Sequence, residues 1–126
     1  MEARVHHMKL LKVYFDKIAS GEKTVEMRLM DEKRQMISVG DRVVFSCEDD
    51  PARTVTLAVA GVQKFSDFSA LARCYGTDAV GFAGYTPEEV GAVMERIYSA
   101  EAVARWGAAA IVLRPKAKEQ NTESST

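Results

Sequence analysis

The spacing of apolar residues changes along the chain and separates predicted strands from predicted helices. Short apolar, alternating or β-branched segments predict strands over residues 5–11, 23–29, 42–46, 54–65 and 108–113. Apolar residues three and four positions apart predict helices over residues 13–20, 68–75, 87–98 and 100–106. The order is strand, helix, a group of strands, a group of helices and a last strand. This order predicts an α+β domain built on a small, mostly antiparallel β-barrel with flanking helices.

Residues at the segment ends support these boundaries. Gly21 suits the left-handed conformation that often follows a helix, and Ser66 or Asp67 can cap the second helix. Residues 86–89, Thr-Pro-Glu-Glu, form a capping box with proline at the first helical position. Gly61 interrupts the longest alternating segment, which predicts a β-bulge there.

The length of 126 residues fits one domain, which we place at residues 1–115. Residues 116–126 are polar apart from Ala117, and we expect a disordered tail. The sequence shows no signal-peptide pattern and no run of about 18 apolar residues, so we expect a cytoplasmic protein without a membrane partner. Cys47 and Cys74 match no zinc spacing and are expected to be free thiols. The sequence leaves the oligomeric state open.

Charge and residue types exclude several kinds of site. The net charge is -1, so no strong overall field attracts a long polyanion. His6 and His7 are adjacent on a predicted strand, so they point to opposite faces and cannot chelate one metal ion. The sequence contains no glycine-rich phosphate loop and no zinc-protease motif. We therefore expect no metal and no cofactor.

The strand predicted after the first helix has two chemically different faces. Val25, Met27 and Leu29 alternate with Glu26 and Arg28. Because alternate residues of a strand point to opposite sides, we expect the three apolar residues to face the barrel core. We expect Glu26 and Arg28 to face a cleft.

Four cationic side chains lie close to Glu26 in this part of the sequence. Lys23 precedes Glu26 and Arg28, and Lys33 and Arg34 follow in a charged loop. Lysine offers a point charge to a phosphate, whereas arginine offers a planar fork to a phosphate or a base edge. This segment is therefore the candidate ligand-binding site.

The residues alone also allow a structural explanation. Glu26 and Arg28 could form an incidental ion pair on a solvated strand face. Tyr75, Tyr98 and Trp106 could stack on bases, although aromatic residues at helical spacing more often belong to the core. Chemistry alone leaves the function open at this point.

Residues 21–28 contain the pattern Gly-x-Lys-x-x-Glu-x-Arg, with Gly21, Lys23, Glu26 and Arg28 at its fixed positions. Further along the chain follow the turn Val39-Gly40-Asp41, the pair Tyr98-Ser99 and the pair Trp106-Gly107 before the last strand. In these features the chain resembles the ASCH family. The resemblance implies a β-barrel similar to the PUA domain and a cleft lined by the motif. It also implies that the partner is RNA or a nucleotide or nucleoside ligand.

Two hypotheses follow from the resemblance. In a binding module, Lys23, Glu26, Arg28, Lys33 and Arg34 would hold a phosphate or a base, and nothing would be cleaved. In an enzyme, Lys23 would polarise the substrate and Glu26 would accept a proton. The resemblance implies a hydrolase in that case, acting on RNA as a ribonuclease or on an acylated nucleoside as an amidohydrolase.

This chain departs from the amidohydrolases that it resembles. Those enzymes carry a threonine at the position of Glu26 and a further glutamate where residues 77–85 of this chain offer only Asp78. Of the residues that those enzymes use, this chain therefore contains only the lysine, at Lys23. This departure favours the binding hypothesis over the catalytic one.

Overall fold

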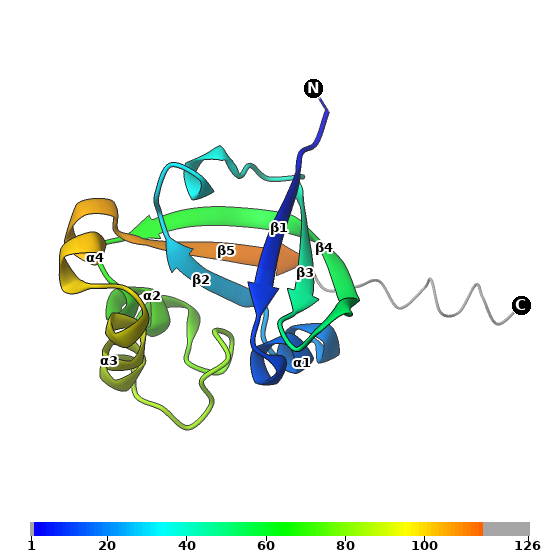
Figure 1. Ribbon diagram of the computed structural model, residues 1–126. Coiled ribbons are helices and arrows are strands. Elements are labelled where there is room, and N and C mark those ends of the chain that lie inside the picture. Colours follow the sequence, from blue (N-terminus) through cyan, green and yellow to red (C-terminus); the bar gives the residue numbers. More distant parts are fainter. Residues whose placement is uncertain (1, 115–126) are drawn as a thin grey trace, which may run out of the picture.

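The structure, a computed structural model, describes residues 2–114 and consists of one curled sheet with helices packed against it (Figure 1). The strands are β1 (Val5–Leu10), β2 (Val25–Leu29), β3 (Arg42–Cys47), β4 (Asp50–Phe65) and β5 (Ala108–Arg114). The helices are α1 (Lys12–Ser20), α2 (Phe68–Tyr75), α3 (Pro87–Ile97) and α4 (Ala100–Trp106), with a short 3-10 helix at Arg34–Met36. The tail predicted at residues 116–126 lies outside the described residues. No helix of residues 2–114 is long and apolar enough to cross a membrane.

The five strands form a half-barrel in the order β1-β3-β4-β5-β2 (Figure 1). β1 and β3 are parallel, and the other neighbours are antiparallel. The predicted α+β class with a mostly antiparallel barrel is therefore confirmed. β1 and β2 are the two edges of the sheet, and the gap between them is called the seam below.

The helix ends and the bulge lie where the sequence predicted them. Gly21 ends α1 with φ 88°, and the Asp67 side chain accepts a hydrogen bond from the backbone N–H of Ala70 at the start of α2. The capping box at the start of α3 forms completely. The register of β4 against β5 shifts between Val59 and Gly61. The strand predicted over residues 54–65 begins earlier, at Asp50, because Asp50 already pairs with Cys47.

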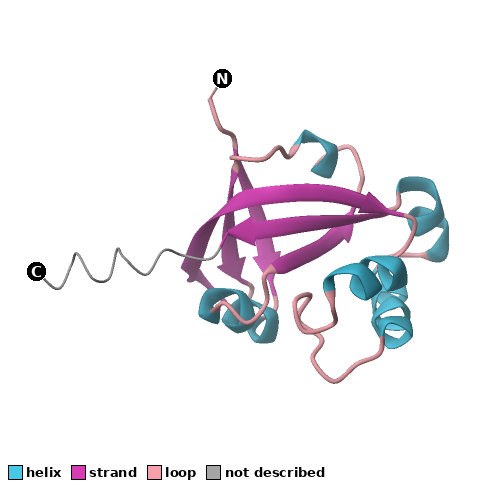
Figure 2. Cartoon of the chain, turned by 180° about the vertical axis from the view of Figure 1, so that it is seen from behind, coloured by secondary structure: helices cyan, strands magenta, loops and turns pink. Residues whose placement is uncertain are grey.

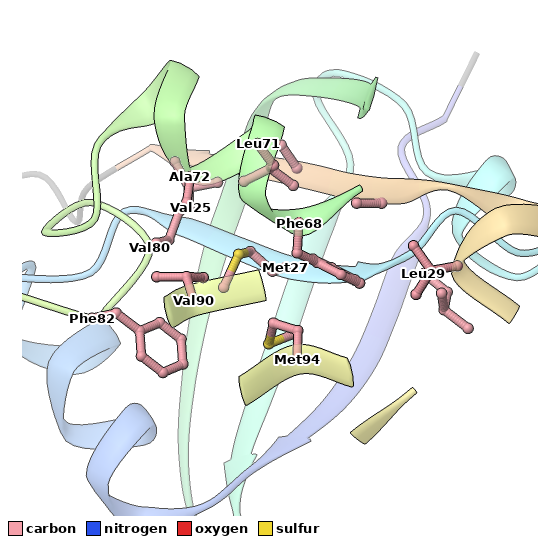
Figure 3. Packing of buried hydrophobic residues seen from close by; sticks show 13 residues of the cluster. Val25, Met27, Leu29, Phe68, Leu71, Ala72, Val80, Phe82, Val90 and Met94 are labelled. Atoms are coloured by element: carbon pink, nitrogen blue, oxygen red, sulfur yellow. The ribbon is translucent and has the colours of Figure 1, made fainter. Parts of the chain in front are cut away.

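The sheet separates two apolar cores. The concave face encloses one core between β1, β3, β4 and β5, with α1 packed against it. Helices α2, α3 and α4 cover the outer face and enclose the other core (Figures 2 and 3). Val25, Met27 and Leu29 belong to this second core. The expectation that they face the barrel core is therefore wrong: their side of β2 is apolar because helices cover it.

Asp41 ties the beginning of β1 to the beginning of β3. Its carboxylate accepts hydrogen bonds from the backbone N–H groups of Arg4 and Ser38, each at 3.0 Å, and lies 2.9 Å from His6 Nε2. The bonds with His6, Arg4 and Ser38, in that order, lower the pKa of Asp41 from 3.8 to about 2. Asp41 therefore stabilises the fold only while it is ionised.

The lowered pKa gives stability a defined dependence on pH. Because the pKa is lower in the folded state, the contribution of Asp41 is fully present above the unfolded value and is lost as the pH falls towards 2. We expect Asp41→Asn to cost about 1–2 kcal/mol at neutral pH. We also expect it to flatten the loss of stability between about pH 4 and pH 2. Urea unfolding across this range tests both effects, with the exposed Asp50→Asn as control; an unchanged pH slope in Asp41→Asn would contradict this role.

Candidate functional site

A pocket of about 300 Å³ opens at the seam, between the edges of β1 and β2. We call it the seam pocket. Its lining comes from both edge strands, from α1 and α3, and from the loop between α2 and α3. The lining residues are Lys9, Leu10, Leu11, Tyr14, Lys23, Glu26, Met27, Arg28, Glu48, Phe82, Met94, Ile97 and Tyr98. A largely apolar pocket with a few polar groups is the usual form of a small-molecule site.

Lys23 enters the pocket from the junction between α1 and β2. Gly21 ends the helix, and the Lys23 backbone N–H donates to the carbonyl oxygen of Lys17 at 3.0 Å. The Lys23 stem passes so close to Gly81 that a β-carbon there would lie 2.7 Å from Lys23 Cδ. Lys23 Nζ lies 5.1 Å from the centre of the Tyr14 ring. Only 5% of Lys23 is exposed, so its ammonium group is fixed in place and largely removed from water.

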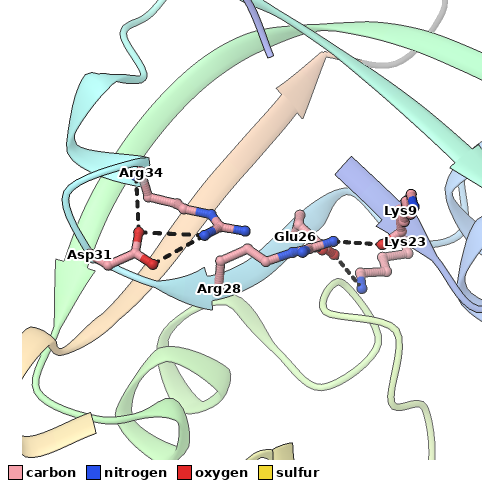
Figure 4. Close-up of polar contacts among 6 residues, drawn as sticks. All are labelled: Lys9, Lys23, Glu26, Arg28, Asp31 and Arg34. Atoms are coloured by element: carbon pink, nitrogen blue, oxygen red, sulfur yellow. Dashed lines mark hydrogen bonds and ion pairs between the residues drawn. The ribbon is translucent and has the colours of Figure 1, made fainter. Parts of the chain in front are cut away.

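Glu26 lies at the centre of an ion network. It pairs in register with Ile111 of β5, so its side chain points to the concave face of the sheet. Glu26 Oε1 lies 2.7 Å from Lys23 Nζ, and Oε2 lies 2.6 Å from Arg28 Nε (Figure 4). Glu26 is 3% exposed, and each of its oxygens has a cationic partner. The network therefore replaces the solvation that all three groups would have in water.

Arg28 connects the network to the opposite edge of the seam. Its Nη2 group donates a hydrogen bond to the carbonyl oxygen of Lys9 on β1 at 2.9 Å (Figure 4). The two edge strands do not pair with each other, so this side chain spans a gap that backbone hydrogen bonds leave open. Arg28 thus helps to hold the pocket at a fixed width.

The two cations keep Glu26 ionised. Burial alone would raise the pKa of Glu26, but the charges of Lys23 and Arg28 and their hydrogen bonds outweigh burial and lower it. A carboxylate with a lowered pKa and both oxygens engaged is a weak proton acceptor. Two cations and one anion leave one net positive charge at the base of the pocket. The site can therefore attract an anion or a hydrogen-bond acceptor.

The structure brings together three of the five predicted ligand-binding residues. Lys23, Glu26 and Arg28 line the seam pocket, whereas Lys33 and Arg34 do not. Lys33 is exposed, and Arg34 pairs with Asp31 at 3.1 Å beside the pocket. A role for Lys33 and Arg34 in ligand binding stays a prediction.

Of the three aromatic residues considered for base stacking, only Tyr98 lines the pocket. The Tyr75 hydroxyl instead donates to Gln63 at 2.8 Å, and Trp106 packs against the core of the outer face. Sequence reasoning missed Tyr14 and Phe82, whose rings lie 5.5 Å apart in the lining. No local pattern identifies them, because they meet only when the loop before α3 folds against α1.

Residues 2–114 contain no group of three histidine, cysteine, aspartate or glutamate residues that could hold a metal ion. His6 contacts Asp41 at the other end of β1 from the seam pocket.

Known structures share this architecture. The crystal structure of hypothetical protein PH0355 is 28% identical, with a TM-score of 0.78, and the match covers 89% of this chain and 99% of that one. The solution structure of PF0455 from Pyrococcus furiosus is 27% identical, with a TM-score of 0.68 over 88% of this chain and 96% of that one. The S128A mutant of an ASCH protein from Zymomonas mobilis is 19% identical, with a TM-score of 0.61 over 95% and 78%, and shows the fold alone.

No curated protein matches the chain. The ASCH domain family, in contrast, matches residues 8–116. These residues contain the whole Gly-x-Lys-x-x-Glu-x-Arg pattern and every side chain that lines the seam pocket. The chain therefore belongs to the ASCH domain family.

Proposed function

We propose that this protein binds RNA or a nucleotide-like ligand, and that the ligand enters the seam pocket and contacts Lys23 and Arg28. The observation that carries the proposal is the buried network of Lys23, Glu26 and Arg28 at the base of an open pocket. Glu26 holds both cations in place, so their remaining N–H groups are preorganised for an acceptor.

The energetics of the network support a binding role. Replacing a buried ion network by apolar residues of similar volume is often neutral or stabilises a protein by about 1–4 kcal/mol. Apolar residues at the bottom of this pocket would therefore be compatible with a stable fold. The presence of two cations at this place is better explained by a ligand than by the fold.

The size and lining of the pocket favour a small unit of nucleic acid. A volume of about 300 Å³ lies at the lower end of ligand pockets and suits one base or nucleoside. The rings of Tyr14, Phe82 and Tyr98 supply apolar surfaces of the kind on which bases stack. A net charge of -1 argues against a long nucleic-acid footprint.

A hydrolase is the second candidate, and the contact of 2.7 Å between Lys23 and Glu26 favours it. A proton acceptor and a polarising cation lie side by side in the pocket, as that mechanism requires. The lowered pKa of Glu26 argues against it as the base. We therefore place binding first and catalysis second.

One panel separates the two candidates. Ribonucleosides, nucleotides, acylated cytidine and short single-stranded RNAs are titrated calorimetrically, and each mixture is then analysed for products by chromatography. Binding without turnover supports the first candidate, and product formation supports the second. If no compound of the panel binds or reacts, the proposed function is wrong.

Gly81 offers a test of how Lys23 is positioned. Gly81 has φ +91°, and a β-carbon there would displace the Lys23 stem. We expect Gly81→Ala to weaken binding of the best ligand in the panel about tenfold or more, since one charge-assisted hydrogen bond is misplaced. The matched control is Gly84→Ala in the same loop, where φ is +89° and no atom lies within 4 Å of the added carbon.

Both variants carry the cost of left-handed backbone, about 1–2 kcal/mol. Only Gly81→Ala moves Lys23. Equal affinities of the two variants would show that the position of Lys23 does not control binding.

A further inference from the structure

The Arg34 side chain lies beside the seam pocket and is not fully paired. Its Nη1 group bonds Asp31 Oδ2 at 3.1 Å, and its backbone N–H bonds Asp31 Oδ1 at 3.1 Å. Arg34 Nε is buried and has no hydrogen-bond partner among the described residues. A buried donor without a partner costs about 1–3 kcal/mol, so it calls for an acceptor that the described chain does not supply.

Arg34 points towards the ion network. Figure 4 shows its side chain extending from the loop after β2 towards Arg28. Tyr98 and Arg28 both line the pocket. Burial raises the pKa of Tyr98, and the charges of Arg28 and Arg34 oppose that rise. Arg28 and Tyr98 line the pocket, and Arg34 extends towards Arg28 from beside it.

The charges in this region do not cancel. Lys23, Glu26 and Arg28 form one ion network, with two cations and one anion, and Arg34 and Asp31 form a separate ion pair. One positive charge is left over, although the net charge of the whole chain is -1. The side chains of Arg28 and Arg34 are 16% and 14% exposed, so a ligand can reach them.

We infer that Arg28, Arg34 and the hydroxyl of Tyr98 form a phosphate subsite at the edge of the seam pocket. The inference rests on the proposed function and deepens it. The ligand is then phosphorylated: a nucleotide, or an RNA segment whose phosphodiester occupies this subsite while its base enters the pocket. A guanidinium group matches phosphate oxygens, and the N–H groups of Arg28 and Arg34 that are left without a partner among the described residues can donate to one phosphate from two sides. Arg34 contacts the phosphate and does not touch the base, so it sets the preference for a phosphorylated ligand.

The test compares ligands that differ only in the phosphate. The four ribonucleosides, their 3′- and 5′-monophosphates and dinucleotides are titrated against the folded chain. We expect a monophosphate or a dinucleotide to bind about tenfold or more tightly than its nucleoside, because charge-assisted hydrogen bonds are added. The better of the two phosphorylated forms identifies a terminal or an internal phosphate as the natural partner.

Arg34→Gln should remove most of this advantage and leave nucleoside affinity nearly unchanged. It should also weaken the salt dependence of nucleotide binding, since a phosphate contact is lost. Arg34→Lys keeps the charge without the fork and should restore only part of the advantage. The control is Arg42→Gln. Arg42 is exposed, lies outside the pocket and is at the end of β3 farther from it.

The outcomes are distinguishable. If nucleosides bind as tightly as their phosphorylated forms, or if Arg34→Gln keeps the full advantage, the phosphate subsite is wrong while the proposed function stands. If neither kind of ligand binds, the proposed function fails and the subsite with it. Thermal melting of each variant shows whether a loss of binding reflects unfolding.

Discussion

Glu26→Ala should lower the free energy of unfolding by about 3–5 kcal/mol, because it leaves two buried cations without their shared carboxylate. Lys23 is 5% exposed and Arg28 is largely buried, so water cannot readily replace the lost partner. Chemical denaturation at neutral pH measures this change directly.

Asp16→Ala is the matched control. Asp16 also bridges two cations, Lys12 at 2.9 Å and Arg53 at 3.1 Å, but its side chain is 41% exposed. Exposed pairs of this kind contribute little to stability, because water and salt screen them. Both carboxylates pair with two cations, so a difference in stability between the two variants measures the effect of burial.

A double variant tests whether the unpaired buried cations cause the loss of stability in Glu26→Ala. Lys23→Met removes one of the stranded cations and keeps an apolar stem under Gly81. Glu26→Ala combined with Lys23→Met should be more stable than Glu26→Ala alone, because one unpaired buried charge is gone. If Glu26→Ala costs no more than Asp16→Ala, the buried network does not depend on its shared carboxylate as described above.

Arg28→Lys should weaken binding of the best nucleotide or RNA ligand by about 1–3 kcal/mol. One ammonium group cannot bond both Glu26 and the Lys9 carbonyl across the seam and still present a fork to the ligand. The affinity of the folded variant for the same ligand, measured by calorimetry, gives the size of the loss.

Arg53→Lys provides the control for this substitution. Arg53 also pairs with a carboxylate, that of Asp16, but it is 43% exposed and lies outside the seam pocket. Its replacement should leave ligand affinity within about twofold of the wild type. Equal affinities of Arg28→Lys and the wild type would show that the guanidinium fork has no part in recognition.

The sequence predicted the elements of the fold better than their arrangement. Alternation of Val25, Met27 and Leu29 with Glu26 and Arg28 predicted the strand, because the period of a strand is a local property. It could not show which face the helices cover, since that depends on α2, α3 and α4 packing from far along the chain. The apolar face of β2 was therefore assigned to the wrong core.

For the candidate site, too, the sequence predicted the residues but not their arrangement in space. The motif identified Lys23, Glu26 and Arg28, but it did not predict that Lys23 would be buried. The structure buries Lys23 because the loop before α3 lies over it and brings Gly81 against its stem. Contacts between residues so far apart in sequence leave no periodic signal, and the same holds for the bond from Arg28 to the Lys9 carbonyl.

The seam explains why the site lies where it does. A closed barrel would pair β1 with β2 through the backbone, whereas here the edges remain apart and side chains occupy the gap. Unpaired strand edges expose backbone donors and acceptors, which proteins usually cover. In this domain the two edges are covered by the ion network and by the loop before α3. In the proposed function, the ligand covers them as well.

The central claim is that the ligand binds in the seam pocket, and amide chemical shifts test it most directly. A nitrogen–proton correlation spectrum of the labelled chain is recorded while the best nucleotide or RNA ligand of the panel is added. The claim predicts that the largest shifts occur in residues 9–11, 23–28 and 81–82 and at Tyr98, and that they vanish in Lys23→Met. Large shifts confined to other surfaces, or unchanged shifts in that variant, would contradict it.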